Sequence, residues 1–223
     1  MEGHEPLQFD HDVTEEELLQ RASSFLDTAR NRRSVRFFSD RPVPREVIES
    51  CIQVAGTAPS GANKQPWHFV AVGDPELKHK IRIAAEQEEH EFYNNRAPQD
   101  WLDALTPMAT NEKKPFLEVA PWLVAIFSEA YSHDDEDQKV KHYYVPESVG
   151  IATGMLISAL NSCGLATLTH TPSPMKFLRD ILGRSENQRP FLLLVVGFPS
   201  EDCIVPKLTK KSMDELATFH EGK

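Results

Sequence analysis

Two short and almost wholly apolar runs, PWLVAIF at 121–127 and FLLLVVG at 191–197, constrain the fold of this chain more than any other feature. Apolar runs of about four to eight residues, bounded by Pro, Gly or polar residues, are typical of buried strands. A strand that is apolar on both sides needs a covering layer on each face of its sheet. We therefore expect both runs to lie in the core of a layered domain.

The rest of the chain alternates unevenly between strand and helix patterns. A capping box at Thr14–Glu17 predicts a helix start, and Gly164 ends the most apolar helical pattern. We expect strands at 35–38, 67–72, 121–127, 166–169 and 191–197, and helices at 14–30, 44–56, 74–93, 147–163 and 175–182. Residues 94–118 are expected to be irregular, and 133–137 to form a solvated acidic loop. This uneven order favours a three-layer α+β domain over a doubly wound α/β fold.

Composition and charge exclude several classes of protein. The chain has 223 residues and a formal net charge of −10, which fits one domain and argues against a nucleic-acid partner. No apolar run reaches the roughly 18 residues of a membrane span, and the start lacks a signal-peptide pattern. We therefore expect a soluble, cytoplasmic protein that does not contact membranes. Three widely spaced cysteines without metal-ligand spacing fit a reducing compartment and predict no metal site.

An arginine cluster, Arg32, Arg33 and Arg36, runs against the acidic average of the chain. The guanidinium fork donates two parallel hydrogen bonds and is well suited to a phosphate. The segment alone fits a second interpretation equally well. Cations are also favoured next to a helix C-terminus, so the cluster could be a solvated basic patch.

The segment from Pro59 to Asn63 consists of small residues with accessible backbone. Gly61 permits close approach, and neighbouring N–H groups can face a flat or anionic ligand. By itself the segment is more simply a tight connection between a helix and a strand. Its combination with the arginine cluster and with the corner at 169–172 favours a binding site.

Three motifs, taken together, resemble the nitroreductase-like flavoprotein superfamily. They are RRSVRFF at 32–38, APSGANKQPW at 58–67 and GFP at 197–199, and the resemblance covers roughly residues 14–215. The segments RRSVRF, GTAPSGA and KHYY at 141–144 are similar to the iodotyrosine deiodinase branch. The resemblance implies an α+β sandwich of three α/β/α layers with FMN at the interface of an intertwined homodimer. It also implies a flexible segment at 1–13, a domain at 14–198 and a C-terminal arm at 199–223 that packs on the partner.

The resemblance also implies roles for individual residues. The FMN phosphate and pyrimidine edge would contact Arg32, Arg33, Ser34 and Arg36, with Lys210 reaching the phosphate from the arm. The isoalloxazine would lie along Pro59, Ser60 and Gly61. Thr169 would place a hydroxyl near flavin N5, and the Ala62 backbone N–H would receive the phenolate oxygen of the substrate. His170, where threonine is more usual, receives no role.

A second set of residues would grip the substrate. Glu89 and Tyr93 share one helix face, and Lys114 follows the irregular stretch, so the three could bind the ammonium and carboxylate of an amino acid. By chemistry alone, the glutamates of this helix are typical of a solvated face. The spacing, with Trp101 after Tyr93, resembles the substrate triad of iodotyrosine deiodinases. Residues 94–118 would then form a substrate lid, centred on 106–115.

The implied activity is FMN-dependent reductive dehalogenation of halotyrosines, in which mono- and diiodotyrosine yield tyrosine plus halide by stepwise one-electron transfer. The electrons would come from an unidentified reductant, such as an NADPH-linked reductase. Two alternatives stay open from the sequence. The same fold could serve an NAD(P)H-dependent nitroreductase or quinone reductase, or a sensor that binds halotyrosine or flavin without turnover.

Overall fold

The computed structural model describes residues 4–9, 12–105 and 110–222, and its centre is a four-stranded antiparallel sheet. The two apolar runs lie in its two middle strands and pair directly, with Leu123 opposite Val195. The strand order is β1 (Trp67–Val72), β2 (Trp122–Glu129), β6 (Gln188–Gly197) and β5 (Ala166–His170). The expectation that both runs form core strands is confirmed.

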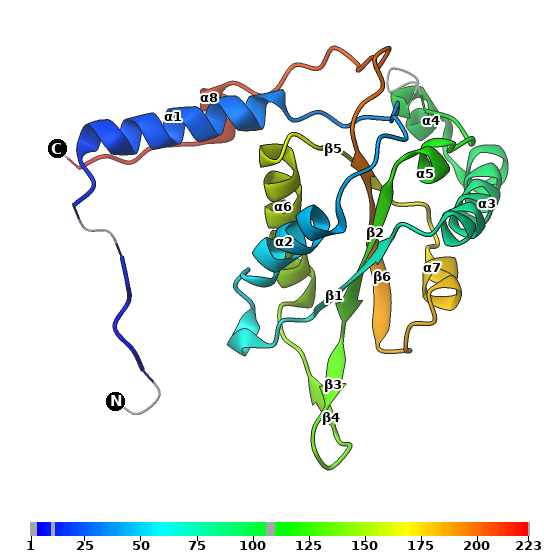
Figure 1. Ribbon diagram of the computed structural model, residues 1–223, viewed down its shortest axis with the longest axis horizontal. Helices are drawn as coiled ribbons and strands as arrows, with labels where there is room; N and C mark the ends of the chain where they lie inside the picture. The colour runs from blue at the N-terminus through cyan, green and yellow to red at the C-terminus, as the bar shows by residue number, and fades with distance from the viewer. Residues whose placement is uncertain (1–3, 10–11, 106–109, 223) are drawn as a thin grey trace.

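Helices cover both faces of this sheet, as the apolar character of β2 and β6 requires. Successive strand residues point to opposite faces, so Leu123 and Ala125 pack in one core while Val124 and Ile126 pack in the other. The first core is closed by α3 (Pro75–Glu91), α5 (Phe116–Val119) and α7 (Lys176–Ile181), and the second by α2 (Arg45–Gly56) and α6 (Val145–Ser162). Figure 1 shows the resulting three-layer arrangement, which confirms the predicted fold class.

Local capping signals place several helix ends where the sequence predicts them. α1 (Glu15–Asn31) begins with the predicted capping box, in which the side chains of Thr14 and Glu17 each accept from the backbone of the other. α6 ends at Ser162 and is followed, after Cys163, by Gly164, whose φ of +77° lies in the left-handed region that glycine adopts without strain.

Two predicted segments differ from the structure, and a third, the acidic loop, is exposed as predicted but lies in a hairpin that the sequence did not predict. Residues 35–38 form no strand, because only Ser34 and Phe38 make isolated bridges, and they pair with different segments. The acidic loop at 133–137 is the turn of a hairpin between β3 (Tyr131–His133) and β4 (Lys139–Lys141), where Asp134 accepts two backbone N–H groups. The stretch 94–118 contains part of η2 (Phe92–Arg96), α4 (Gln99–Leu105) and α5, which are too short to leave a clear periodic signal.

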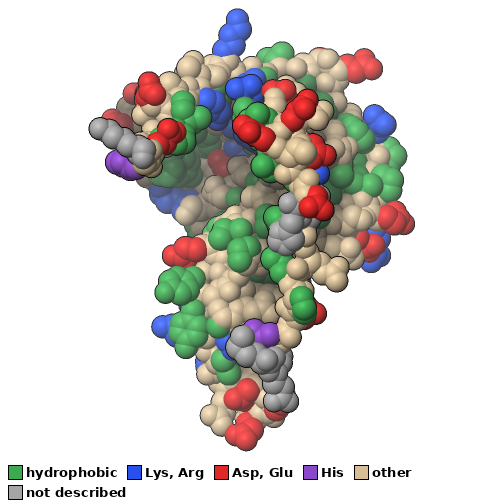
Figure 2. Space-filling model, turned by 90° about the vertical axis from the view of Figure 1, so that its left-hand side faces the viewer, with side chains coloured by type: hydrophobic (Ala, Val, Ile, Leu, Met, Phe, Trp, Pro, Cys, Tyr) green, Lys and Arg blue, Asp and Glu red, His purple; other side chains and the backbone are tan. Residues whose placement is uncertain are grey.

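An elongated arm projects from this sandwich. α1 buries none of its residues, and Leu19 and Phe25 are 66% and 59% exposed. The C-terminal segment returns along α1 and includes α8 (Met213–Leu216) (Figure 1). Figure 2 shows hydrophobic side chains exposed on this side of the molecule. Within the described ranges, no helix has the length and apolar character that a membrane crossing requires.

Candidate active site

A basic cavity of about 720 Å³ lies between the end of α1 and the C-terminal segment. The predicted phosphate ligands Arg32, Arg33, Ser34, Arg36 and Lys210 all line it. Among the described residues that line it there is no carboxylate, although Arg30, which also lines it, pairs with Asp27 at 3.3 Å. This donor set fits the phosphate of FMN, because guanidinium groups and an ammonium group bind phosphate oxygens through charge-assisted hydrogen bonds.

The main chain supports this cavity from two directions. Arg33 Nη2 donates to the carbonyl of Pro206, which links the arginine cluster to the C-terminal segment. The Val35 backbone N–H donates to the Thr167 carbonyl at 3.1 Å, which fixes the cluster against the edge of β5. The backbone of the cluster therefore bends so that its arginine side chains line one cavity. In an extended segment they would point to alternate sides.

A second cavity, of about 250 Å³, is lined by the three residues predicted to grip the amino-acid group of the substrate. Glu89, Tyr93 and Lys114 line it together with Thr169, and we refer to Glu89, Tyr93 and Lys114 as the head-group clamp. Lys114 Nζ lies 3.3 Å from Glu89 Oε2 and 5.7 Å from the centre of the Tyr93 ring. Arg36 lines this cavity as well as the basic one, so a ligand could extend from one to the other.

The clamp holds two charges away from water. The side chains of Lys114 and Glu89 are only 4% and 12% exposed. Burial raises the pKa of Glu89 and lowers the pKa of Lys114, and the attraction between the two groups opposes both shifts. For each group, the cost of burial exceeds the benefit of the partner. A zwitterion that supplies a new oppositely charged partner to both groups would therefore offset the free-energy cost of burying their charges.

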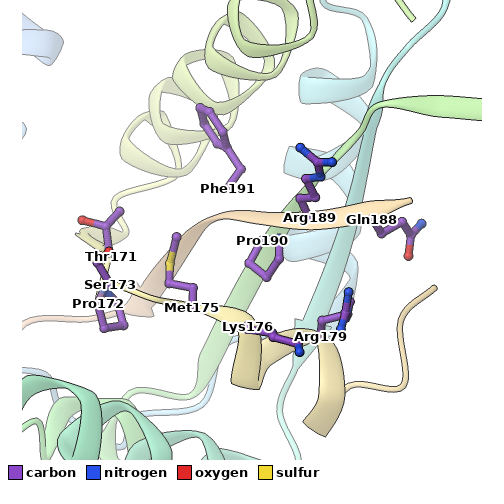
Figure 3. A pocket seen from close by; sticks show the side chains of 10 residues that line it. All are labelled: Thr171, Pro172, Ser173, Met175, Lys176, Arg179, Gln188, Arg189, Pro190 and Phe191. Atoms are coloured by element: carbon purple, nitrogen blue, oxygen red, sulfur yellow. The ribbon is translucent and has the colours of Figure 1, made fainter. Parts of the chain in front are cut away.

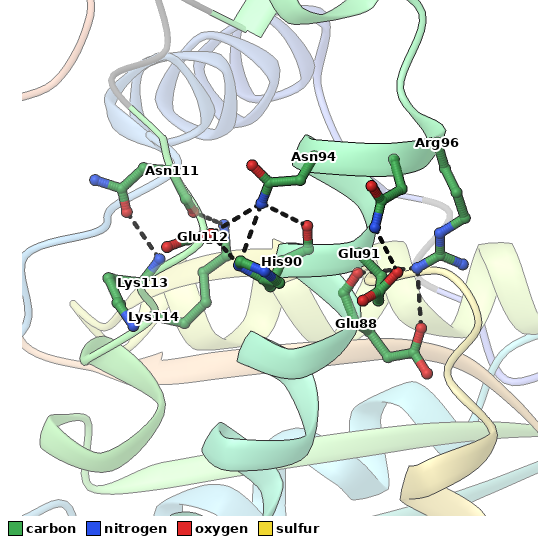
Figure 4. Close-up of polar contacts among 10 residues, drawn as sticks. Glu88, His90, Glu91, Asn94, Arg96, Asn111, Glu112, Lys113 and Lys114 are labelled. Atoms are coloured by element: carbon green, nitrogen blue, oxygen red, sulfur yellow. Dashed lines mark hydrogen bonds and ion pairs between the residues drawn. The ribbon is translucent and has the colours of Figure 1, made fainter.

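The segment around Lys114 is tied to the C-terminal end of α3. His90 Nδ1 lies 2.8 Å from Glu112 Oε2, and the Lys114 backbone N–H donates to Glu86 Oε1 at 2.7 Å. Figure 4 shows the contact between His90 and Glu112 and, nearby, the ion pair between Arg96 and Glu88 at 3.0 Å. Tyr93 lies in the π-helical turn η2, a distortion that is frequent at functional sites. Of the predicted lid, residues 106–109 lie outside the described residues.

His170 is the residue that sequence reasoning missed. It follows Thr169 at the end of β5, and strand alternation exposes Thr169 while His170 is buried. His170 Nδ1 lies 4.0 Å from Glu89 Oε1, and its ring meets Phe116 edge-on with centroids 5.8 Å apart. Burial, aided by the positive charges of Lys114 and Arg36, lowers the pKa of His170 to about 3. A titratable side chain at an inward-facing strand position was the signal available in the sequence.

The predicted flavin-contacting loop lies apart from both cavities. None of the residues from Pro59 to Ala62 lines either of them. In Figure 1 this loop (cyan) lies below α2, on the left, whereas the segment after α1 lies near the upper end of the molecule. The loop packs instead near Tyr143, whose carbonyl would lie 3.0 Å from a Cβ added at Gly61. Its helical turn η1 (Gly61–Asn63) places Ala62 at a φ of 50°, an uncommon and strained conformation for a residue with a side chain.

A third cavity, of about 400 Å³, carries none of the predicted site residues. Lys176, Arg179 and Arg189 bring positive charge to it, around Met175 (Figure 3). It shares residues 171–173 with the cavity of the head-group clamp, so the two cavities lie on either side of this segment.

The sandwich and its basic cavity define a class of FMN-binding protein, and comparison with protein families agrees. Residues 29–198 match the model of the nitroreductase family. A nitroreductase with bound FMN from Bacteroides fragilis shares the fold, with a TM-score of 0.64 at 21% identity, over 88% of this chain and 98% of that one.

More specific relatives narrow the assignment. The iodotyrosine deiodinase of Haliscomenobacter hydrossis is 53% identical over 196 residues, which cover 88% of each chain. Human iodotyrosine deiodinase 1 is 42% identical over 216 residues, or 96% of this chain and 74% of the human protein. A crystal structure of oxidized iodotyrosine deiodinase bound to FMN and 3-iodo-L-tyrosine matches with a TM-score of 0.74 at 32% identity, over 87% of this chain and all of that one. The chain therefore belongs to the nitroreductase family and, within it, to the iodotyrosine deiodinases.

Proposed function

We propose that the protein catalyses the FMN-dependent reductive dehalogenation of halotyrosines, converting mono- and diiodotyrosine to tyrosine and iodide. The observation that carries this proposal is the buried Glu89–Lys114 pair beside Tyr93, in a cavity that also reaches Thr169. A nitroreductase acting on uncharged aromatic compounds has no use for a buried acid and base at this place. Relatives named iodotyrosine deiodinase support the same reaction.

The head-group clamp would bind the amino acid by exchange of partners. The substrate ammonium would pair with the carboxylate of Glu89. The substrate carboxylate would pair with the ammonium of Lys114 and accept a hydrogen bond from the Tyr93 hydroxyl. Each buried charge keeps a counter-charge throughout, so the exchange avoids the cost of stranding a buried ion. The free energy of this exchange selects an amino acid over a simple phenol.

The basic cavity would hold FMN by its phosphate, through Arg32, Arg33, Ser34, Arg36 and Lys210. When bound, FMN supplies the two electrons of the reaction. The chain contributes the Thr169 hydroxyl toward the flavin edge and the Ala62 backbone N–H toward the phenolate oxygen. In the balanced reaction the carbon–iodine bond breaks and iodide leaves with its electron pair, while the ring carbon gains a proton and the two supplied electrons, which form the new carbon–hydrogen bond.

A second copy of the chain would complete the site. Because Pro59–Ala62 lies apart from both cavities, one chain does not bring all the predicted FMN contacts together. The exposed apolar side chains of α1, α6 and the C-terminal segment suit a homodimer, since contiguous exposed apolar surface marks interaction sites. We therefore propose FMN at a dimer interface, with the loop at 59–62 coming from the partner and the arm at 199–223 packing on it.

Anaerobic turnover tests the proposed reaction. The FMN-loaded protein is given dithionite as reductant and either 3-iodotyrosine or a nitroaromatic compound. We expect equal amounts of iodide and tyrosine from the first and little reduction of the second above the rate without protein. Absence of iodide release, together with reduction of the nitroaromatic compound well above the rate without protein, would instead identify a nitroreductase.

A further inference from the structure

His170 stands next to the head-group clamp on a different element. Glu89 belongs to the last turn of α3, just before the π-helical turn, whereas His170 belongs to the central sheet. Within the described part of the chain, Lys114 and His170 are the cationic or titratable nitrogen groups that lie within 4.0 Å of the Glu89 carboxylate. Of these two groups, His170 is the one that the sheet contributes.

The exchange of partners leaves Glu89 in need of a second contact. In the structure its Oε2 lies 3.3 Å from Lys114 Nζ, while its Oε1 lies 4.0 Å from His170 Nδ1. When Lys114 turns to the substrate carboxylate, the first contact weakens. A carboxylate accepts hydrogen bonds on both oxygens, so a donor at Oε1 would keep it oriented for the ammonium.

We propose that His170 is a positioning residue of the head-group clamp, whose uncharged imidazole donates from Nδ1 to Glu89 Oε1 once substrate binding shortens the 4.0 Å between these atoms, and so holds this carboxylate for the substrate ammonium. The inference rests on the proposed function and deepens it, because it assigns substrate selection to a residue outside the clamp.

The surroundings of the imidazole determine its tautomer. Nε2 is fully buried and has no hydrogen-bond partner among the described residues. A buried N–H without a partner is rarer and costlier than a buried acceptor without one. The proton therefore belongs on Nδ1, which faces Glu89, and the imidazole stays uncharged because its pKa is lowered to about 3. An uncharged donor can orient Glu89 without competing with the ammonium as a second cation.

Two substitutions separate positioning from packing. His170→Leu keeps an apolar side chain against Phe116 and removes the donor, whereas His170→Asn places an amide N–H near the position of Nδ1. Each variant, loaded with FMN, is titrated with 3-iodotyrosine and with 2-iodophenol while flavin fluorescence is recorded. The second ligand keeps the phenol and halogen and lacks the zwitterion, so it reports changes in the flavin site alone.

We expect His170→Leu to weaken iodotyrosine binding about tenfold, as for loss of one charge-assisted hydrogen bond, and to leave iodophenol binding within about twofold. His170→Asn should recover iodotyrosine binding to within about threefold of the unsubstituted protein. If the Leu variant does not fold, His170→Thr replaces it, because its hydroxyl is too short to reach Oε1, and it should show the same selective loss.

The proposed role is wrong if His170→Leu or His170→Thr leaves both affinities unchanged or weakens both by the same factor. It is also wrong if the Asn variant behaves like the Leu variant. An unsubstituted protein that releases no iodide would overturn the proposed function itself, which separates the two failures.

Discussion

At the residue scale, burial of the two charges of the head-group clamp costs more free energy than the attraction between them provides. A buried ion pair often contributes little or nothing to stability, although removal of one partner is strongly destabilising. Here both pKa values move toward the uncharged forms despite a contact of 3.3 Å between Lys114 and Glu89. Such a pair is better explained by binding than by folding, because a zwitterion satisfies both groups at once.

Glu89→Gln should therefore reduce iodotyrosine affinity by at least about tenfold and leave iodophenol affinity unchanged, because only the ammonium loses its partner. Flavin fluorescence titration measures both values. Glu91→Gln is the matched control, since Glu91 belongs to the same helix, is exposed and pairs with Asn95 at the surface. Equal losses in the two variants would mean that the helix and not the clamp had been disturbed.

The shifted pKa values also predict how affinity depends on pH. The substrate needs Glu89 ionised and Lys114 protonated. Because the pKa of Glu89 is raised above 4.5, affinity should fall on acidification at a pH above that value. Because the pKa of Lys114 is lowered below 10.5, affinity should also fall before that value on the alkaline side. Affinity measured from pH 5 to 10 checks this, with iodophenol as the reference ligand. In Glu89→Gln, iodotyrosine affinity should no longer fall at acidic pH relative to iodophenol affinity.

At the element scale, the four strands of the central sheet and the long helices follow from the sequence, whereas the short elements do not, and the strand expected at 35–38 does not form. β2, β6 and α6 carry enough apolar residues for their period and length to identify them. α4 and α5 have only seven and four residues, so tertiary contacts decide their shape. The clamp residues could be predicted only with the help of the family resemblance, because Glu89 by itself looks like one of several solvated glutamates on its helix. His170 could not be assigned, because its contact with Glu89 depends on how β5 packs against α3.

α1 provides the prediction for this scale. Phe25 is 59% exposed, so Phe25→Glu should change the free energy of unfolding of an isolated chain by no more than about 0.5 kcal/mol. In the proposed dimer it should weaken association and reduce the FMN content. Sedimentation velocity and flavin absorbance measure these effects. Ser23→Glu, on the same helix and also exposed, is the control. If the Phe25→Glu protein stays dimeric with full FMN content, α1 is not part of the dimer interface.

At the scale of the whole molecule, the account depends on a site divided between two chains. The arginine cluster and the clamp lie on one part of the sandwich, and the loop at 59–62 lies on another. Closed homodimers place two equivalent composite sites at one interface. The loop at 59–62 of one copy can therefore meet the arginine cluster and the clamp of the other. The dimer, the exchanged arm and the cytoplasmic location stay predictions.

Complementation between two inactive variants tests this division. Arg36→Ala removes one half of the site, and Gly61→Val disturbs the other, because an added Cβ would already lie 3.0 Å from the Tyr143 carbonyl. Each mixed dimer would contain one intact site. Refolding the two variants together in equal amounts should restore about a quarter of the unsubstituted activity, given random pairing. No recovery in confirmed mixed dimers would show that each site lies within one chain.

The central claim is tested most directly by an anaerobic single turnover. The protein, with its FMN reduced by one equivalent of dithionite and no excess reductant, is mixed with 3-iodotyrosine, and iodide, tyrosine and flavin absorbance are followed together. The account predicts about one iodide and one tyrosine for each FMN that is reoxidised, because replacement of iodine by hydrogen consumes two electrons. Flavin that stays reduced, with iodotyrosine recovered intact, would contradict it.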